Sequence, residues 1–344
     1  MASRRASITD LAKTLGLSPS TISRALSDHH DVSEATKLRV RQLAAELHYQ
    51  PNQLAAALRR GHSNTLGVLV PHITGHFFPL VVHGIATEAA KLGFNVMMCQ
   101  SNEDTRQEQT NLDLLMNAQV EGILVSLANT TQDFGHFEAV RQQNVPLVFF
   151  DRLVEGFRGR NVSSVVLDDY QGAYQAVAHL IGQGCTRVAH LTGPLNLSIN
   201  KNRHQGYRDA LTAHGLPVLD ELIVFGEMTQ KGGTQGMRQL LKLPRRPDGI
   251  FASNDLAAVG ALQVARTHRL RVPQDVAIVG FSNEIFTALT EPMLSTVDQR
   301  GEQMGRTAVQ QLHKLLKGGA THPELRPVVL KPKLLVRASS QRKP

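Results

Sequence analysis

The sequence lacks the features that mark several classes of protein. Its 344 residues include only two cysteines, Cys99 and Cys185, and no tryptophan. Two cysteines cannot form a disulfide framework, so we expect two buried thiols in a reducing compartment. No apolar run approaches the ~18 residues of a membrane-spanning helix, and the charged start of the chain is not followed by the apolar segment of a signal peptide. We therefore expect a cytoplasmic protein that does not contact a membrane.

Motifs for catalysis and for cofactor binding are also missing. The sequence contains no GxGxxG, GxxxxGK[ST], GxSxG or HExxH pattern. His72 and His76 are four residues apart but lie in a predicted loop, so we do not take them as a metal site. The adjacent Asp168 and Asp169 are more typical of a helix cap than of a catalytic pair. We expect no enzymatic activity, no catalytic residue, no metal and no cofactor.

The chain does contain an uneven distribution of charge. It carries 37 Lys and Arg against 29 Asp and Glu, a formal net charge of +8. Residues 1–62 hold nine Lys or Arg and five Asp or Glu, so the first fifth of the chain carries half of the excess. Such a segment is expected where a protein meets phosphate groups. A solvated basic surface is the alternative that charge alone leaves open.

Two short amphipathic helices are predicted near the start of the chain. The first spans residues 8–15 and ends at Gly16, which permits a sharp turn. The second has an N-cap at Ser18 and a proline at its first position, Pro19, and it extends to about Leu26. Two helices joined by such a turn are typical of the helix-turn-helix motif, whose second helix enters the major groove of DNA.

The outward face of the second helix carries small polar residues and one long cation. Small side chains allow close approach to DNA, and Arg24 is long enough to reach base edges or phosphates. A third helix is predicted from the Ser33 cap to about His48 and closes a three-helix core. A plain helical hairpin inside a larger core is the alternative, which the basic character of this segment disfavours.

A shorter helical segment follows between residues 52 and 61. It is too short to be stable alone in water, so we expect it to become ordered only when Leu54 and Leu58 are buried. The minor groove of DNA offers one such place, because leucine can be inserted between base steps there. A linker helix packed on the next domain is the alternative.

From Thr65 onward, β-rich runs alternate with helical stretches of roughly 10–15 residues, which predicts parallel sheets in an α/β fold. A helix is missing between Asp151 and Val165, which suggests that the chain crosses there between two similar lobes. In open α/β sheets, ligands bind beyond the carboxyl ends of the strands. Polar or aromatic residues collect at these ends: Phe77, Phe78, Asp151, Arg152, Asp168, Asp169, Asn254, Asp255, Ser282 and Asn283.

These segments resemble the LacI/GalR family of transcription regulators, over a region from Ile8 to about Arg337. The resemblance implies an all-α helix-turn-helix DNA-binding domain followed by a two-lobed α/β ligand domain of the periplasmic-binding-protein type (type I). It further implies a homodimer that binds palindromic operator DNA and responds to a small-molecule effector, a sugar or sugar derivative. The most specific matches are Ile8-Thr-Asp-Leu-Ala, Ser18-Pro-Ser-Thr-Ile-Ser-Arg24-Ala-Leu, Leu47-His-Tyr-Gln-Pro-Asn52, Gly67-Val-Leu-Val-Pro71, Arg203-His-Gln-Gly206 and Ala252-Ser-Asn254-Asp255.

The resemblance also assigns roles to the residues at matching positions. Pro19, Ser20 and Arg24 stand where the family reads bases, and Leu58 matches the leucine that enters the minor groove. Further DNA contacts are implied for Ser18, Thr21, Ser23, Ser33, Thr36 and Asn52. Effector contacts are implied for Phe77, Phe78, Asp151, Arg203, Asn254, Ser282, Asn283 and Gln299.

One departure from the family concerns the effector. An aspartate that commonly accepts sugar hydroxyls in the family is Ser282 here, followed by Asn283. Arg203 then becomes the strongest polar anchor, and it would suit a carboxylate or phosphate on the ligand. An arginine that braces its own lobe through an ion pair is the alternative.

The predicted organisation follows from these observations. Residues 1–50 form the helix-turn-helix domain, 51–63 a hinge helix or linker, 64–337 the ligand domain and 338–344 a disordered tail. We expect the first lobe to comprise about 65–165 and 298–326, and the second about 166–297 and 327–337. Two other functions remain open: a cytoplasmic carbohydrate-binding protein, and a sugar- or nucleotide-processing enzyme of the same architecture.

Overall fold

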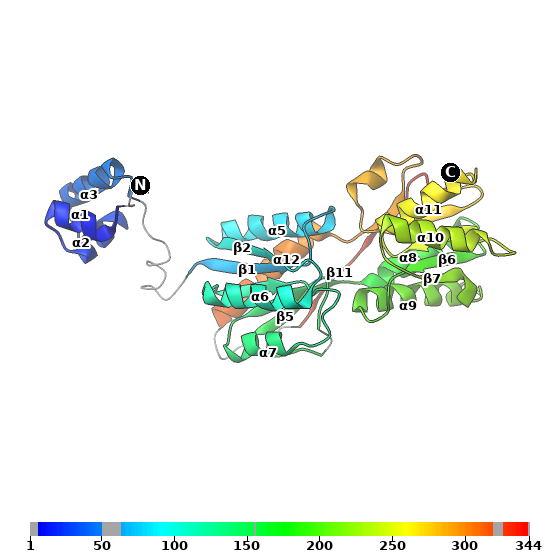
Figure 1. Cartoon of the computed structure of the whole chain (residues 1–344), viewed down its shortest axis with the longest axis horizontal. Coiled ribbons are helices and arrows are strands. Elements are labelled where there is room, and N and C mark those ends of the chain that lie inside the picture. Colours follow the sequence, from blue (N-terminus) through cyan, green and yellow to red (C-terminus); the bar gives the residue numbers. More distant parts are fainter. Residues whose placement is uncertain (1–5, 50–62, 155, 319–325, 343–344) are drawn as a thin grey trace. The chain divides into compact units, whose positions relative to one another are not determined.

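A computed structural model of the chain describes residues 6–49, 63–154, 156–318 and 326–342. The chain divides into two compact units, Met1–Ser63 and Asn64–Pro344, and each is considered by itself (Figure 1). Almost all of the predicted hinge segment, including Asn52 and Leu58, lies outside the described residues. Within the described ranges, no helix is long and apolar enough to cross a membrane.

Residues 6–49 of the first unit form a bundle of three helices, each of which begins at a serine cap. The side chains of Ser7, Ser18 and Ser33 each accept a hydrogen bond from the backbone amide three residues further on. Gly16 ends the first helix with φ of 64°, a left-handed conformation that glycine adopts without strain. The helices are α1 (Ile8–Leu15), α2 (Pro19–Leu26) and α3 (Glu34–Glu46).

The core of this unit follows the predicted apolar faces. Leu11, Ile22 and Val40 are fully buried, one from each helix. The third helix was predicted to extend to about His48, but it ends at Glu46 and Leu47 is exposed. Lys37 is buried although it is charged, because its ammonium group reaches carboxylates at the rim of the core.

The second unit is built on two six-stranded sheets, which define its first and second lobes. The first sheet has the order β11-β5-β4-β3-β1-β2 and the second the order β12-β10-β9-β8-β6-β7, so the second repeats the topology of the first. The strands of the first lobe are β1 (Thr65–Val70), β2 (Asn95–Gln100), β3 (Gly122–Val125), β4 (Leu147–Phe150), β5 (Val162–Leu167) and β11 (Val328–Leu330). Those of the second are β6 (Val188–Thr192), β7 (Ile223–Phe225), β8 (Gly249–Ala252), β9 (Ala277–Phe281), β10 (Ser295–Asp298) and β12 (Lys333–Leu335).

Helices cover both sheets, and three helix pairs pack closely at glycines. A Cβ atom added to Gly305, Gly206 or Gly233 would lie 2.0–2.3 Å from a carbonyl oxygen of the partner helix, so a larger residue would force apart α5 and α12, α8 and α9, or α10 and α11. The first lobe carries α5 (Phe77–Lys91), α6 (Thr105–Asn117), α7 (Gly135–Gln142) and α12 (Gly301–Gly318). The second carries α8 (Asp169–Gly182), α9 (Ser198–Ala213), η1 (Asp220–Leu222), α10 (Gln230–Leu241), α11 (Asp255–Thr267) and η2 (Ile285–Ala288).

The strands pair in parallel as predicted, with one exception. β12 runs antiparallel to β10, where Thr296 faces Leu335. The chain returns to this sheet by a short connection rather than through a crossover helix, and a short connection can place β12 antiparallel at the edge of the sheet.

The chain passes between the lobes three times, after β5, β10 and β11. The prediction of a crossing between Asp151 and Val165 was wrong, because that segment links β4 to β5 in one sheet and Val165 faces Phe150. The assignment of all of 327–337 to the second lobe was also wrong, since β11 pairs with β5 of the first lobe. Short apolar strands look alike in a sequence, so their pattern does not identify the sheet in which they pair.

The end of the described chain is packed, which corrects the prediction of a disordered tail over 338–344. Ser339 and Ser340 are fully buried. The Ser339 hydroxyl donates to a carbonyl of β9 at 2.6 Å, and the Arg342 guanidinium donates to two carbonyls of neighbouring loops at 2.6 and 2.7 Å. Short polar side chains satisfy these buried backbone groups, so a polar composition did not mean disorder here.

The two cysteines are free thiols. Cys185 is buried as predicted, whereas Cys99 on β2 is only half-buried. Burial raises the pKa of both thiols, which keeps them protonated and weakly reactive.

Candidate functional site

The outward face of α2 in the first unit carries hydroxyl groups and one exposed arginine. Ser18 Oγ lies 2.7 Å from Ser20 Oγ and 2.8 Å from Thr21 Oγ1. Pro19 and Arg24 are exposed on the same helix. No carboxylate in the described part of the chain forms an ion pair with Arg24, so its guanidinium is available to a phosphate or a base edge.

The start of α3 repeats the arrangement at the start of α2. Ser33 caps the helix, and Ser33 Oγ lies 2.9 Å from Thr36 Oγ1. Each helix thus begins with a serine followed by a threonine three residues later. Backbone amides and hydroxyls at a helix N-terminus suit phosphate oxygens, so the two helix starts offer similar contacts.

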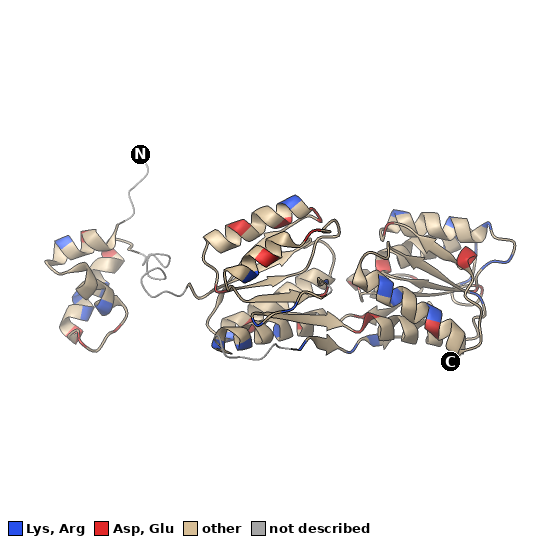
Figure 2. Ribbon diagram, turned by 90° about the horizontal axis from the view of Figure 1, so that it is seen from below, with Lys and Arg blue, Asp and Glu red and all other residues tan. Residues whose placement is uncertain are grey.

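The helices of the first unit are not themselves basic. Between residues 6 and 49, five Lys or Arg are matched by five Asp or Glu, and both signs appear along these helices in Figure 2. The excess positive charge predicted for this region comes from Arg4, Arg5, Arg59 and Arg60, which lie outside the described residues. Within the helices, single cations such as Arg24 therefore matter more than the overall charge.

In the second unit, most predicted effector residues follow the carboxyl ends of strands. Phe77 and Phe78 begin α5 after β1, and Asn254 caps α11 directly after β8. Arg203 is different, because it lies within α9. The remaining positions are Asp151 after β4, Ser282 and Asn283 after β9, and Gln299 after β10.

Arg203 is held by groups of its own lobe. Its Nε donates to Asp169 Oδ1 at 2.7 Å and its Nη1 to the carbonyl of Ser253 at 2.7 Å. The guanidinium also lies over the ring of Phe281, 3.8 Å from the centroid. The side chains of Arg203 and Asp169 are both 5% exposed. Burial raises the pKa of Asp169, although Arg203 opposes this effect. The geometry favours the structural brace over the anion anchor.

A chain of hydrogen bonds extends from Arg203 to the strand ends of the second lobe. Arg203 Nη2 lies 3.5 Å from Gln299 Oε1, and Gln299 Nε2 donates to Ser282 Oγ at 2.6 Å. The backbone is left-handed at Ser282 and Asn283, with φ of 127° and 57°. Strained backbone at strand ends is often found where ligands bind.

The two predicted asparagines also have partners within the protein. Asn254 Oδ1 accepts from the amide of Ala257 at 2.9 Å, and its Nδ2 donates to the carbonyl of Met228 at 2.6 Å. Asn283 Oδ1 accepts from Arg337 Nη2 at 3.0 Å. An effector that uses these amides would share them with the bonds that hold the loops.

Asp151 is the predicted residue with the fewest partners. It is 7% exposed, and no residue in the described ranges donates a hydrogen bond to its carboxylate. The nearest cation is Arg152, whose Nε lies 3.8 Å from Asp151 Oδ2. Burial raises the pKa of Asp151 to about 6, although Arg152 and Arg203 lower it. This carboxylate can still accept hydrogen bonds from a ligand.

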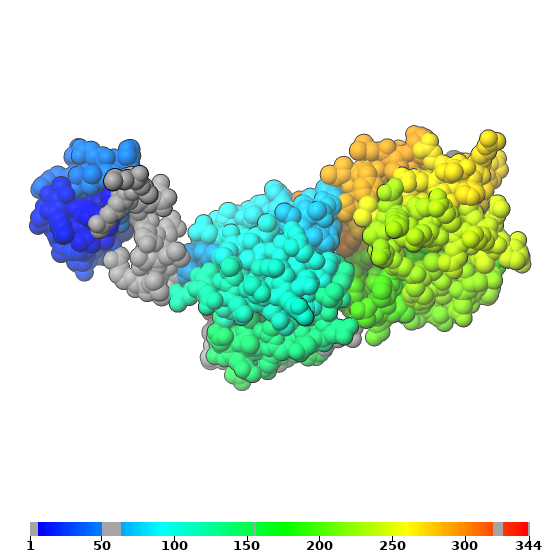
Figure 3. Space-filling view, viewed as in Figure 1, coloured from blue at the N-terminus to red at the C-terminus, as the bar shows by residue number. Residues whose placement is uncertain are grey.

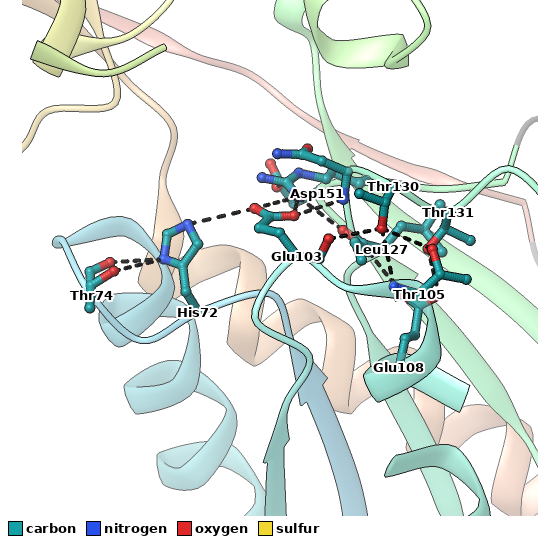
Figure 4. A network of polar contacts seen from close by, with 12 residues as sticks. His72, Thr74, Glu103, Thr105, Glu108, Leu127, Thr130, Thr131 and Asp151 are labelled. Atoms are coloured by element: carbon teal, nitrogen blue, oxygen red, sulfur yellow. Dashed lines mark hydrogen bonds and ion pairs between the residues drawn. The ribbon is translucent and has the colours of Figure 1, made fainter. Parts of the chain in front are cut away.

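A polar network that was not predicted from the sequence lies beside Asp151 (Figure 4). Glu103, after β2, accepts from Arg152 Nη1 at 2.8 and 3.0 Å and from the amide of Asn129 at 2.7 Å. Arg152 Nη1 also donates to the carbonyl of Leu127 at 3.0 Å, and His72 Nε2 lies 3.9 Å from Glu103 Oε1. The polar run after β2 was the signal that could have revealed Glu103.

Loops of the two lobes also approach each other. Gly75, after β1, has φ of +86°, and a Cβ atom there would lie 3.4 Å from Glu284 Oε1 of the second lobe. Figure 3 shows the two lobes of this unit in contact along one side. The loops after β1 and β9 therefore meet near the predicted effector residues.

Comparison with known proteins gives the family. Residues 7–52 match bacterial regulatory proteins of the lacI family, and residues 177–340 match the periplasmic binding protein-like domain. The HTH-type transcriptional repressor CytR of Escherichia coli strain K12 is 33% identical over 314 residues, which cover 91% of this chain and 90% of that protein. The chain belongs to the lacI family.

Other lacI-family proteins agree over the same length. The ribose operon repressor of Escherichia coli strain K12 is 33% identical over 308 residues, which cover 89% of this chain and 92% of that protein. A solved structure of the lac repressor dimer bound to operator and the anti-inducer ONPF has a TM-score of 0.86 and 26% identity, and the match covers 98% of this chain and 99% of that chain. The predicted fold is confirmed. The chain is a DNA-binding transcription regulator of the lacI family that a small-molecule effector controls.

Proposed function

We propose that this regulator binds a palindromic operator as a homodimer through α2, and that a neutral polyhydroxylated effector binds at the strand ends of its second unit without being chemically changed. The observation that carries the DNA part is the exposed, unpaired Arg24 among the hydroxyl groups of α2. The solved lac repressor structure is of a dimer bound to operator, which supports the same assembly here.

The DNA contacts of the proposal divide into two kinds. Pro19, Ser20 and Arg24 face the bases of one half-site, since they lie on the exposed side of α2. The helix starts and their hydroxyls meet phosphates, which position the unit without reading sequence. This second set is Ser18, Thr21, Ser23, Ser33 and Thr36. DNA contacts by Asn52 and Leu58 are also part of the proposal. Both residues lie outside the described ranges, so these contacts are proposed from the sequence resemblance alone.

The effector part of the proposal follows from charge. Asp169 already neutralises Arg203, so an anionic ligand group would bury a second negative charge beside Asp169. Asp151 offers a hydrogen-bond acceptor instead, and Phe77 and Phe78 begin α5 of the same lobe, with their rings packed in its core at 9% and 4% exposure. Acceptors and aromatic rings suit the hydroxyls and the C–H faces of a sugar or nucleoside. The name of the ribose operon repressor supports a sugar of this kind.

Replacing Arg24 tests the DNA part. We expect Arg24→Ala to weaken specific operator binding by about 1–3 kcal/mol per half-site, because a guanidinium can form two bonds to one base. Arg39→Ala is the matched control, since Arg39 is another exposed arginine of the same unit, on α3. Gel-shift titrations at fixed salt, with operator and with non-specific duplex, measure both variants. Equal losses in the two variants, or none in Arg24→Ala, would refute the proposed recognition face.

A further inference from the structure

The turn between α2 and α3 brings two histidines and an aspartate together. His29, His30 and Asp31 are consecutive, and each offers one donor atom within 4.8 Å of the other two. In the described ranges, no other three histidine, cysteine or acidic residues gather in this way. The cluster has no role in the helix core or in the DNA contacts proposed above.

The donor atoms already stand at distances close to those around a metal ion. His29 Nδ1 lies 3.3 Å from Asp31 Oδ2, and His30 Nε2 lies 2.8 Å from Asp31 Oδ1. Tetrahedral donors at about 2.0–2.1 Å from zinc are about 3.3 Å apart. The two imidazole rings are stacked, with centroids 4.5 Å apart and planes at 25°. His29 Nδ1 also lies 3.4 Å from the amide nitrogen of Asp31, which donates to it, and a bound ion would replace this hydrogen bond. Small side-chain movements would complete the site.

The backbone that carries these donors is fixed on both sides. Asp28 has φ of 58°, and the next amide, of His29, donates to the carbonyl of Arg24 at 2.9 Å. On the other side, Val32 is buried in the helix core, and its amide lies 3.3 Å from the carbonyl of His29. A ligand that binds here does not need to order the turn, which removes much of the usual entropic cost.

The neighbouring cations form ion pairs with Asp28 and not with Asp31, which contacts the two histidines. Lys37 Nζ and Arg41 Nη2 lie 3.1 and 2.7 Å from Asp28 Oδ1, so they balance the preceding aspartate. The side chains of His29, His30 and Asp31 are 43%, 87% and 50% exposed. An ion can therefore enter from solvent and keep a water molecule on its open side.

We propose that His29, His30 and Asp31 bind a divalent transition-metal ion such as Zn²⁺. Two imidazole nitrogens and a carboxylate oxygen are ligands that zinc prefers, with the fourth position open. Ion pairs between protonated imidazoles and Asp31 are the competing explanation, in which protons take the place of the metal. No metal site was expected from the sequence, where only the spacing of His72 and His76 was considered. The cluster at residues 29–31 revises that expectation.

Zinc titration of the full-length protein tests the site. After treatment with a chelator, we expect calorimetry to show one Zn²⁺ bound per chain, and the His29→Ala/His30→Ala double variant to bind at least about tenfold more weakly. His48→Ala is the control, since His48 is an exposed histidine of the same unit outside the cluster. Circular dichroism checks that the variants fold. Equal binding by wild type and double variant, or no binding by wild type, would overturn the proposal.

A second arm asks whether the ion affects DNA binding, and it rests on the proposed function. The cluster ends two residues before Ser33, a proposed phosphate contact, so a bound cation adds positive charge beside the DNA backbone. We expect Zn²⁺ to raise the operator affinity of wild type and to leave that of the double variant unchanged. If wild type binds Zn²⁺ but its operator affinity does not respond, the coupling is refuted while the metal site is established.

Discussion

In the second lobe, the predicted polar effector residues are hydrogen-bonded within the protein, whereas in the first lobe one buried carboxylate accepts no hydrogen bond from any described residue. Arg203, Asn254 and Asn283 each have partners within the protein. Asp151 of the first lobe has only the distant Arg152 beside its carboxylate. Two lobes with the same strand order thus use similar positions differently: the second holds its own loops with these side chains, and the first keeps a carboxylate that can accept hydrogen bonds at the proposed effector site.

Two buried aspartates make the contrast sharper. Asp255 of the second lobe accepts hydrogen bonds from Thr296 Oγ1 at 2.7 Å and from the amide of Glu284 at 2.8 Å. Burial raises the pKa of Asp255 to about 7 and that of Asp151 to about 6. Similar burial therefore accompanies different roles, and the hydrogen-bond partners, rather than the pKa values, distinguish them.

The largest expected effect compares the buried arginines of the two lobes. Arg203→Ala leaves Asp169 buried and unpaired, so we expect a loss of about 3–5 kcal/mol in the free energy of unfolding. Arg152→Ala leaves Glu103, which is 26% exposed and accessible to water, and takes from Asp151 a cation that lies 3.8 Å away without donating a hydrogen bond to it. We therefore expect a smaller loss of about 1 kcal/mol. Urea unfolding of the full-length protein measures both.

A second substitution checks the cause of the Arg203 effect. Adding Asp169→Asn to Arg203→Ala removes the buried charge and should restore part of the lost stability. If Arg203→Ala and Arg152→Ala lower the free energy of unfolding by the same amount, the proposed contrast between the two lobes is refuted.

The next prediction compares Asp151 with Asp255 as partners of the effector. We expect Asp151→Asn to abolish the rise in Tm that a neutral sugar or nucleoside produces in wild type, and Asp255→Asn to lower the Tm but keep that rise. A panel of neutral sugars, nucleosides, sugar acids and phosphosugars in thermal-shift assays provides the probes. A rise in Tm with the acids and phosphates alone would instead favour an anion held by Arg203.

The same assay has an expected pH dependence. The carboxylate of Asp151 accepts ligand hydroxyls best when ionised, and its pKa is about 6. The ligand-induced rise in Tm should therefore shrink as the pH falls through 6, in wild type and in Asp255→Asn alike, since both retain Asp151.

The smallest effect concerns acid stability of the second lobe. His190 is fully buried and stacked on Phe251, and burial lowers its pKa to about 3. Since the unfolded chain binds this proton at higher pH, the contribution of His190 to stability is lost as the pH falls from about 6.5 toward 3. Asp151 and Asp255 have raised pKa values and act in the opposite direction.

A matched variant isolates the histidine. His190→Phe keeps a ring against Phe251 but cannot titrate, and both raised aspartates remain in it. We expect the difference in urea midpoint between wild type and this variant to change between about pH 7 and about pH 5, with wild type losing more on acidification. A constant difference would show that the pKa of His190 is the same in the folded and unfolded states.

Local signals in the sequence predicted much of the first unit. Ser18, Pro19 and Gly16 act on backbone groups a few residues away, so the caps and the turn could be read directly. Most strands of the second unit were also found, because buried parallel strands are short apolar runs. The three-residue strands β11 and β12 were not. Pairing of distant segments was not predictable, which is why β11 was placed in the wrong lobe.

The candidate site divides in the same way. Asp151 and Asn254 follow strands, and this position together with the family resemblance suggested them. The partner of Arg203 could not be foreseen, since Asp169 is 34 residues away and meets it only through the packing of α8 on α9. Glu103 was missed because its link to Arg152 spans 49 residues. Side-chain chemistry suggested candidate residues, but only the fold showed which charged side chains are already paired within the protein.

The chain connects the two lobes at three crossings, so no single crossing is needed to keep them covalently linked. A backbone cut at any one crossing leaves two covalent connections, so a single proteolytic nick does not release a lobe. Because the strands before the crossings are fixed in their sheets, opening or closing must twist all three crossings together. Three connections of this kind permit a hinge rotation of one lobe relative to the other and resist a shear motion between them. The second unit therefore has one easy motion, and an effector can only bias how far that rotation proceeds.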